Sequence, residues 1–244
     1  YNDFTAFQTD SRGVNTSNWY FNPSTYQLYV KLVNVGNPDP STHQMTVARR
    51  NPGFLFNGYG SLNADYIIFK GINVLNHQQY GIQLSQANNV VIDSCTVRGY
   101  GAMGIYSVGG SNSTIQNCRV VDSNIRLLPW NALKYYKQET TGILAKESSG
   151  VVIRNNIIEG GMDAIGLGGG SSGTWQDDTD IYDNSISETG DDGLSLDIFN
   201  GKNVRAWGNT IAGGLTPISA APVQAGPLYV FRNVIFGRLN AALK

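Results

Sequence analysis

The sequence predicts an all-β fold in which short parallel strands stack as the coils of a solenoid. Similar hydrophobic runs recur from residue 66 onward, and the fourth residue of each run falls at 72, 95, 118, 156, 184, 209 and 233. Successive runs are therefore 23, 23, 38, 28, 25 and 24 residues apart. A second short run follows most of these about ten residues later, which leaves no room for the helical crossover of a βαβ unit. The repeat favours a parallel β-helix, whose coils stack about 4.8 Å apart.

The N-terminal segment does not share this repeat. An aromatic run at residues 18–22 is followed by an Asn-Pro-Ser turn and by an alternating run at residues 27–32, a pattern typical of a β-hairpin. We expect residues 1–60 to form a β cap that covers an otherwise open sheet edge. Residues 61–244 are then expected to form one continuous solenoid domain of about seven coils.

One column of the repeat carries small and polar side chains that should lie above one another. Its residues read Ile, Cys, Cys, Asn, Asn, Asn and Asn in chain order. Stacked asparagines can hydrogen-bond along such a column and satisfy the backbone of the turns. Cys95 and Cys118 lie one coil apart with parallel side-chain directions, which is a poor geometry for a disulfide. We therefore expect two buried free thiols.

Composition narrows the class of protein. Lys and Arg number 17 against 18 Asp and Glu, so the net charge is -1. This balance gives no electrostatic reason to expect binding to nucleic acid or to an anionic membrane. No apolar run reaches the roughly 18 residues of a membrane span. The chain begins Tyr-Asn-Asp, without Met or a basic leader, as expected of a mature or trimmed product. Together with few charges and many glycines, this favours a secreted or cell-surface protein of bacterial type.

Two coils carry extra residues, and loops that decorate a rigid solenoid are where ligand contacts concentrate. One insertion lies at residues 125–139 and the other at residues 168–179. Each contains a tryptophan beside charged residues, and aromatic faces commonly stack on sugar rings. The alternative is that each tryptophan only anchors its own loop. The expected substrate-binding residues are Trp130, Lys134, Tyr135, Tyr136, Lys137, Trp175, Asp197 and Tyr106.

Three aspartates are expected to meet between these loops. Asp163 and Asp192 occupy equivalent positions in neighbouring coils, just before the second strand run, and should lie about 5 Å apart. Asp191 adds a third carboxylate at the same edge. Such clustering costs stability unless something uses it. A general acid paired with a base-activated water is one use, and a bound cation is another.

The repeat at residues 66–240 resembles the right-handed parallel β-helix proteins of the pectinase-like group. Within it, Gly190-Asp191-Asp192-Gly193 is similar to the Gly-Asp-Asp segment of polygalacturonase-type glycoside hydrolases, and Met162-Asp163-Ala164-Ile165 is similar to their Asn-Thr-Asp-Gly segment. The resemblance implies inverting hydrolysis, in which Asp191 protonates the leaving oxygen while Asp163 and Asp192 activate water. The Gly-His-Gly and Arg-x-Lys segments of that family are absent from this sequence.

The favoured hypothesis is a polysaccharide-degrading glycoside hydrolase, which needs no cofactor, and two others stay open. The second is a polysaccharide lyase or uronan C5-epimerase, in which Arg126 or a residue of the Lys134–Lys137 run would act as the base that removes a proton from the sugar. The aspartates could then bind Ca²⁺, which would neutralise the carboxylate of a uronate. A non-catalytic glycan-binding or adhesion module is the third hypothesis. No His/Cys cluster has the spacing of a metal site. The expected partner is a polysaccharide or oligosaccharide, with the oligomeric state open.

Overall fold

The structure is a computed structural model of the chain. It describes residues 18–22, 24–25, 27–31, 50–60, 64–122, 139–168, 176–196, 200–220, 223, 225–237 and 243. The chain divides into two compact units, residues 1–47 and residues 48–244.

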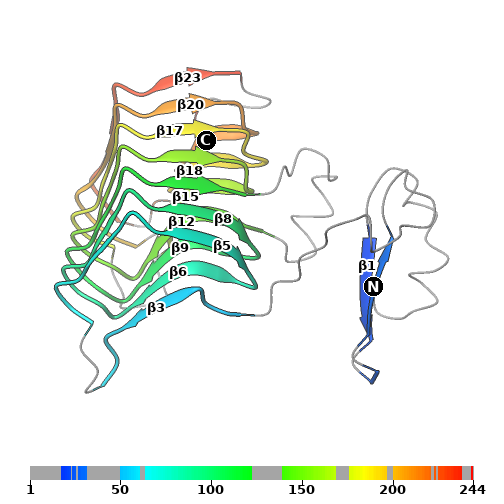
Figure 1. Ribbon diagram of the computed structural model, residues 1–244. Helices are drawn as coiled ribbons and strands as arrows, with labels where there is room; N and C mark the ends of the chain where they lie inside the picture. Colours follow the sequence, from blue (N-terminus) through cyan, green and yellow to red (C-terminus); the bar gives the residue numbers. More distant parts are fainter. Residues whose placement is uncertain are drawn as a thin grey trace. The chain divides into compact units, whose positions relative to one another are not determined.

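The first unit contains the predicted hairpin. Strands β1 (Asn18–Asn22) and β2 (Gln27–Lys31) pair antiparallel, with Asn22 opposite Gln27 (Figure 1). The side-chain oxygen of Asn22 accepts hydrogen bonds from the backbone N–H groups of Ser24 and Thr25, at 2.9 and 3.2 Å. This Asx turn is the local reason that the Asn-Pro-Ser sequence reverses the chain. That the hairpin caps the solenoid stays a prediction.

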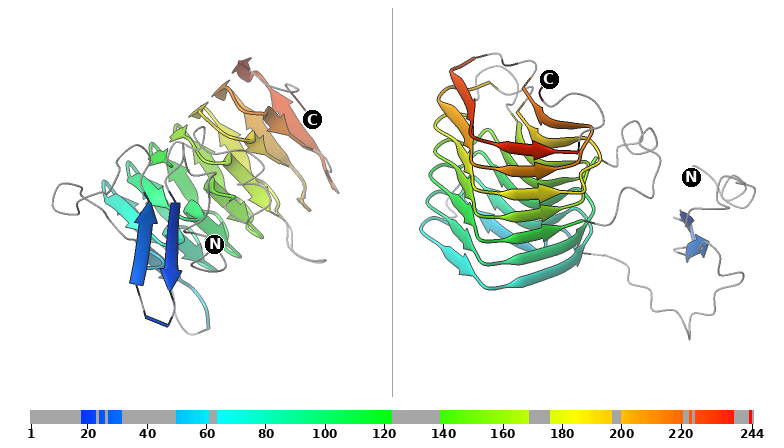
Figure 2. Two further views of the ribbon diagram at one scale, coloured as in Figure 1. Left: turned by 90° about the vertical axis from the view of Figure 1, so that its right-hand side faces the viewer. Right: turned by 90° about the horizontal axis from the view of Figure 1, so that it is seen from above.

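The second unit is a solenoid of three parallel sheets with seven strands each, which confirms the predicted all-β parallel β-helix (Figure 1). Each coil contributes one strand to each sheet, and successive coils lie over one another when viewed along the stack (Figure 2). The strands of sheet I are β3 (Phe54–Asn57), β6 (Tyr80–Ser85), β9 (Met103–Val108), β12 (Thr141–Lys146), β15 (Asp163–Gly168), β18 (Asp192–Ser195) and β21 (Thr216–Ser219).

Sheets II and III are built from shorter strands. Sheet II contains β4 (Ile68–Lys70), β7 (Val91–Asp93), β10 (Thr114–Gln116), β13 (Val152–Arg154), β16 (Asp180–Tyr182), β19 (Val204–Trp207) and β22 (Leu228–Phe231). Sheet III contains β5 (Asn73–His77), β8 (Thr96–Tyr100), β11 (Arg119–Val121), β14 (Ile157–Glu159), β17 (Ser185–Ser187), β20 (Thr210–Ala212) and β23 (Val234–Phe236).

The strand β3 belongs to the solenoid, although the sequence analysis assigned this stretch to the N-terminal segment. Phe54 pairs in parallel with Ile82, and Asn57 pairs with Ser85. A four-residue apolar strand shows no repeat by itself, so its pairing is what assigns it to sheet I.

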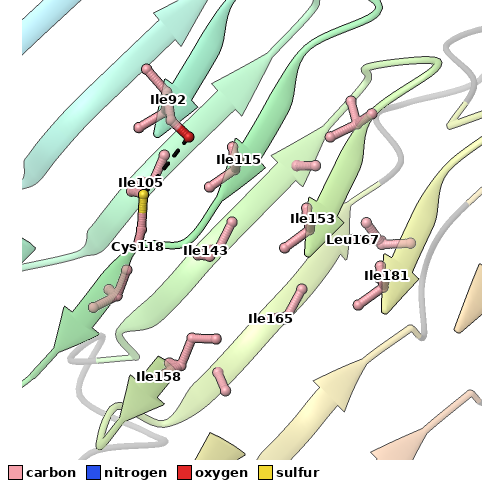
Figure 3. Close-up of a cluster of buried hydrophobic side chains, with 14 of the residues drawn as sticks. Ile92, Ile105, Ile115, Cys118, Ile143, Ile153, Ile158, Ile165, Leu167 and Ile181 are labelled. Carbon is pink, nitrogen blue, oxygen red and sulfur yellow. Dashed lines mark hydrogen bonds between the residues drawn. The ribbon is translucent and has the colours of Figure 1, made fainter. Parts of the chain in front are cut away.

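The core is a set of stacked columns of β-branched and aliphatic residues. Each sheet turns alternate side chains inward, and the inner isoleucines of neighbouring coils lie above one another (Figure 3). Branched side chains suit this pleated, enclosed surface because their few rotamers match the strand conformation. In sheet I the fully buried column is Ile82, Ile105, Ile143, Ile165, Leu194 and Ile218.

The corner between sheets II and III carries the predicted asparagine ladder. The amide nitrogens of Asn156, Asn184 and Asn209 each donate to the side-chain oxygen of the asparagine in the next coil, at 3.0, 2.9 and 2.9 Å. Each of those oxygens also accepts the backbone N–H of the asparagine below it. Cys118 and Cys95 continue the column as buried free thiols, with the backbone N–H of Cys95 directed at the sulfur of Cys118. The ladder therefore satisfies the buried backbone of this corner.

Candidate functional site

The candidate site lies at the corner where sheet III passes into sheet I. Asp163 and Asp192 are the first residues of β15 and β18. Thr141 pairs with Asp163 below them, and Asp192 pairs with Thr216 above them. The backbone N–H of Asp192 donates to a carboxylate oxygen of Asp163 at 3.1 Å. The predicted stacking of these two aspartates in one column is confirmed.

Asp191 joins the pair from the turn that precedes β18. Asp163, Asp191 and Asp192 each offer one carboxylate oxygen such that the three atoms lie within 4.8 Å of one another. Asp191 and Asp192 are buried, with 7% and 6% of their surface exposed, whereas Asp163 is partly exposed. Three carboxylates at this spacing form a concentrated negative charge that reaches solvent through Asp163.

The turns that carry the aspartates are held by backbone hydrogen bonds between coils. The N–H groups of Gly190 and Asp191 donate to the carbonyl groups of Gly161 and Met162 in the coil below, at 2.9 and 2.8 Å. The carbonyl group of Asp191 accepts the N–H of Leu215 from the coil above at 2.8 Å. Because the hydrogen bonding between coils continues through the corner, the three aspartates belong to regularly hydrogen-bonded backbone.

Two glycines explain why this corner can pack so closely. Gly161 has φ +84°, a conformation that favours glycine over residues with a side chain. At Gly193, directly after Asp192, an added Cβ would lie 2.6 Å from a methyl group of Ile211 and 2.6 Å from the carbonyl oxygen of Pro217. The glycine of the Asp-Asp-Gly segment is therefore required for packing between sheets I and III.

The outer face of sheet I extends from the aspartates along the solenoid. Gly166 and Ser195, on the strands that begin with Asp163 and Asp192, are small, and a Cβ added at Gly166 would meet Leu144 at 3.0 Å. The same column continues through Leu144 to Tyr106. Leu144 therefore lies over Gly166, which is buried.

Tyr106 is part of an aromatic pair on this face. Its ring lies with its centroid 5.1 Å from that of Tyr80, and the two rings are tilted by 37°. Burial, followed by the nearby Tyr80 and Glu147, raises the pKa of Tyr106 to about 12. The phenol is therefore neutral at physiological pH and can act only as a hydrogen-bonding, stacking group.

The structure brings together three of the residues predicted from the sequence and places a fourth on the same sheet. Asp163, Asp191 and Asp192 form one cluster, and Tyr106 lies on the same sheet. The other predicted contacts, Trp130, Lys134, Tyr135, Tyr136, Lys137, Trp175 and Asp197, lie outside the described residues. Tyr80 was not predicted as a site residue, although it occupies the same column as Asp163. Extending the column alignment downward by three coils would have found it.

Residues 53–226 match the family described as the right handed beta helix region. The match covers more than half of the chain, so this protein belongs to the right-handed β-helix family. A search among curated proteins finds no match. In the part of the chain that the structure describes, no helix is long and apolar enough to cross a membrane.

Proposed function

We propose that the protein hydrolyses glycosidic bonds of a polysaccharide at Asp163, Asp191 and Asp192. The observation that carries the proposal is the approach of three carboxylate oxygens to within 4.8 Å at the edge of sheet I. Hydrolysis of a glycosidic bond needs a carboxylic acid to protonate the leaving oxygen and a carboxylate to activate water or attack the sugar. The family is broad, and pectinase-like proteins fit within it.

The contacts of the cluster support a division of roles. The N–H of Asp192 donates to Asp163, and a hydrogen bond of this kind favours the ionised carboxylate. Asp163 is thereby suited to activate water, with Asp192 beside it. Asp191 lies on the turn that precedes the strand, buried beside the other two carboxylates. Asp191 is then the group that protonates the leaving oxygen.

Asparagine substitutions test this proposal, because they keep the size of each side chain and remove its acid–base function. We expect Asp191→Asn and Asp192→Asn each to lower the release of reducing ends from a polysaccharide panel by at least about a hundredfold. The matched control is Asp183→Asn, at an exposed turn between β16 and β17. Equal activity in Asp191→Asn and Asp183→Asn, with both variants folded by circular dichroism, would contradict the proposal.

A cation-dependent lyase is the second candidate, because the same three oxygens are of the kind that Ca²⁺ prefers. The cation would neutralise a uronate carboxylate while a base removes the neighbouring proton. This activity would give unsaturated products that absorb in the ultraviolet and disappear with a chelator. A hydrolase would give saturated products that persist with the chelator. Glycan retention without any product would instead support a binding module at the cell surface.

A further inference from the structure

The outer face of sheet I differs from the other two faces in its charges. Among the described strands of sheet I, Lys146 is the one cationic residue, and its ammonium group lies 3.8 Å from the carboxylate of Glu147. The column that runs along the middle of the face carries no charge: Leu55, Gln83, Tyr106, Leu144, Gly166, Ser195 and Ser219. The remaining charges of the sheet are Asp163 and Asp192 of the cluster itself.

Sheets II and III carry several cations on their strands, and Lys70, Arg119, Arg154 and Arg205 each have a polar partner. Arg205 forms a two-point contact with Asp180 at 2.6 and 2.9 Å in sheet II. Arg154 donates twice to Gln116 in the same sheet, at 3.0 and 2.7 Å. The near absence of cations from sheet I is therefore specific to the face that bears the aspartates.

On the described strands of sheet I alone, a polyuronate laid along this face would meet unfavourable electrostatics. Each of its sugars carries a carboxylate, and the described strands offer one cation, already beside Glu147, against the charge of three aspartates. Like charges brought together without a compensating cation weaken the binding of a ligand. A neutral glycan meets no such cost, because its hydroxyl groups can bond to Gln83, Ser195 and the carboxylates.

The tyrosine pair gives such a glycan an anchor at a distance from the aspartates. Tyr80, Met103, Thr141 and Asp163 occupy one column on four successive coils. Tyr80 therefore lies three coils, or about 14 Å, from Asp163 along the solenoid. Tyr106 packs against Tyr80, and both rings remain partly exposed. The apolar ring of a tyrosine can stack on the face of an uncharged sugar, and its neutral hydroxyl group can hydrogen-bond at the edge of that sugar.

We propose that the site takes an electrically neutral glycan along sheet I and that Tyr80 and Tyr106 form its distant sugar subsite. This inference rests on the proposed function, because it assigns the substrate class of the same site. It predicts that only glycans long enough to reach from Asp163 to the tyrosine pair use the subsite.

Binding to a catalytically disabled protein tests the inference without requiring turnover. In the Asp191→Asn background we would measure the affinity for the neutral polymers xylan, mannan and β-glucan, and for the polyuronates polygalacturonate and alginate. We expect at least one neutral polymer to bind. Tyr106→Ala should lower the affinity for that polymer about tenfold, because one stacked ring is lost. Tyr106→Phe should retain the affinity. The matched control, Tyr182→Ala, removes a stacked tyrosine from sheet II and should leave the affinity for the polymer unchanged.

A series of oligosaccharides of the bound polymer separates the distant subsite from a general effect on the fold. We expect Tyr106→Ala to leave disaccharide binding unchanged and to weaken the longer oligosaccharides. Preferential binding of a polyuronate, no binding of any neutral polymer, or equal losses in Tyr106→Ala and Tyr182→Ala would each overturn the inference. The native protein could also bind a neutral glycan through Tyr106 without hydrolysing it. That result would contradict the hydrolase proposal and still support the tyrosine subsite.

Discussion

Asp93 shows how one side chain on this solenoid ties stability to pH. It accepts hydrogen bonds from Lys70 at 2.8 Å and from Asn117 at 2.8 Å, each contributed by a neighbouring coil. The bond from Lys70, followed by that from Asn117, holds the pKa of Asp93 well below its usual range. The unfolded chain lacks these partners, so folding favours the ionised form of this residue.

The sign of the pH dependence follows from this lowered pKa. Stability from Asp93 is fully present above the unfolded value of about 3.9 and is lost as the pH falls toward the folded value. We expect Asp93→Asn to lower the melting temperature at neutral pH, and the difference from the native protein to shrink as the pH falls below about 4. Melting curves across that range measure it. A difference that stays constant on acidification would show that the charge of Asp93 contributes nothing.

At the scale of the element, the asparagine ladder joins the coils at one corner. Asn184 donates to Asn209 and to the carbonyl oxygen of Ile153, and it accepts both the backbone and the side-chain N–H of Asn156. Its side chain is almost fully buried. Removal of one member would leave several buried polar groups without partners.

We therefore expect Asn184→Ala to destabilise the protein by about 1–3 kcal/mol or more, because each unpaired buried group costs about that amount. Urea unfolding monitored by circular dichroism measures the change. The control is Ser185→Ala, at the adjacent exposed position of β17, which should change stability by less than about 0.5 kcal/mol. Similar losses in the two variants would mean that the ladder makes no special contribution.

The second unit is a stack of coils, so the stability of a position in it depends on its neighbours above and below. Ile153 and Val230 occupy the same inward column of sheet II. Ile153 lies between two coils and is fully buried, whereas Val230 lies on the last strand of the sheet and is 37% exposed. Equivalent residues therefore contribute differently at the middle and at the end of the solenoid.

We expect Ile153→Ala to cost about 2–5 kcal/mol, because it leaves a cavity between packed coils. Val230→Ala should cost much less, since that side chain already contacts solvent on one side. The free energies of unfolding of the two variants test this. Equal losses would imply that the last coil is covered in solution.

The order of the residues specifies the repeat, the stacking of the asparagines and cysteines, and the column shared by Asp163 and Asp192. These follow from spacing alone, because parallel coils place equivalent residues above one another. The folded structure supplies what spacing cannot specify. It assigns β3 to sheet I and sets Tyr106 against Tyr80. The reason is physical: pairing along the stack follows the period of the sequence, whereas contacts across a corner or between side chains of different columns depend on how each turn closes.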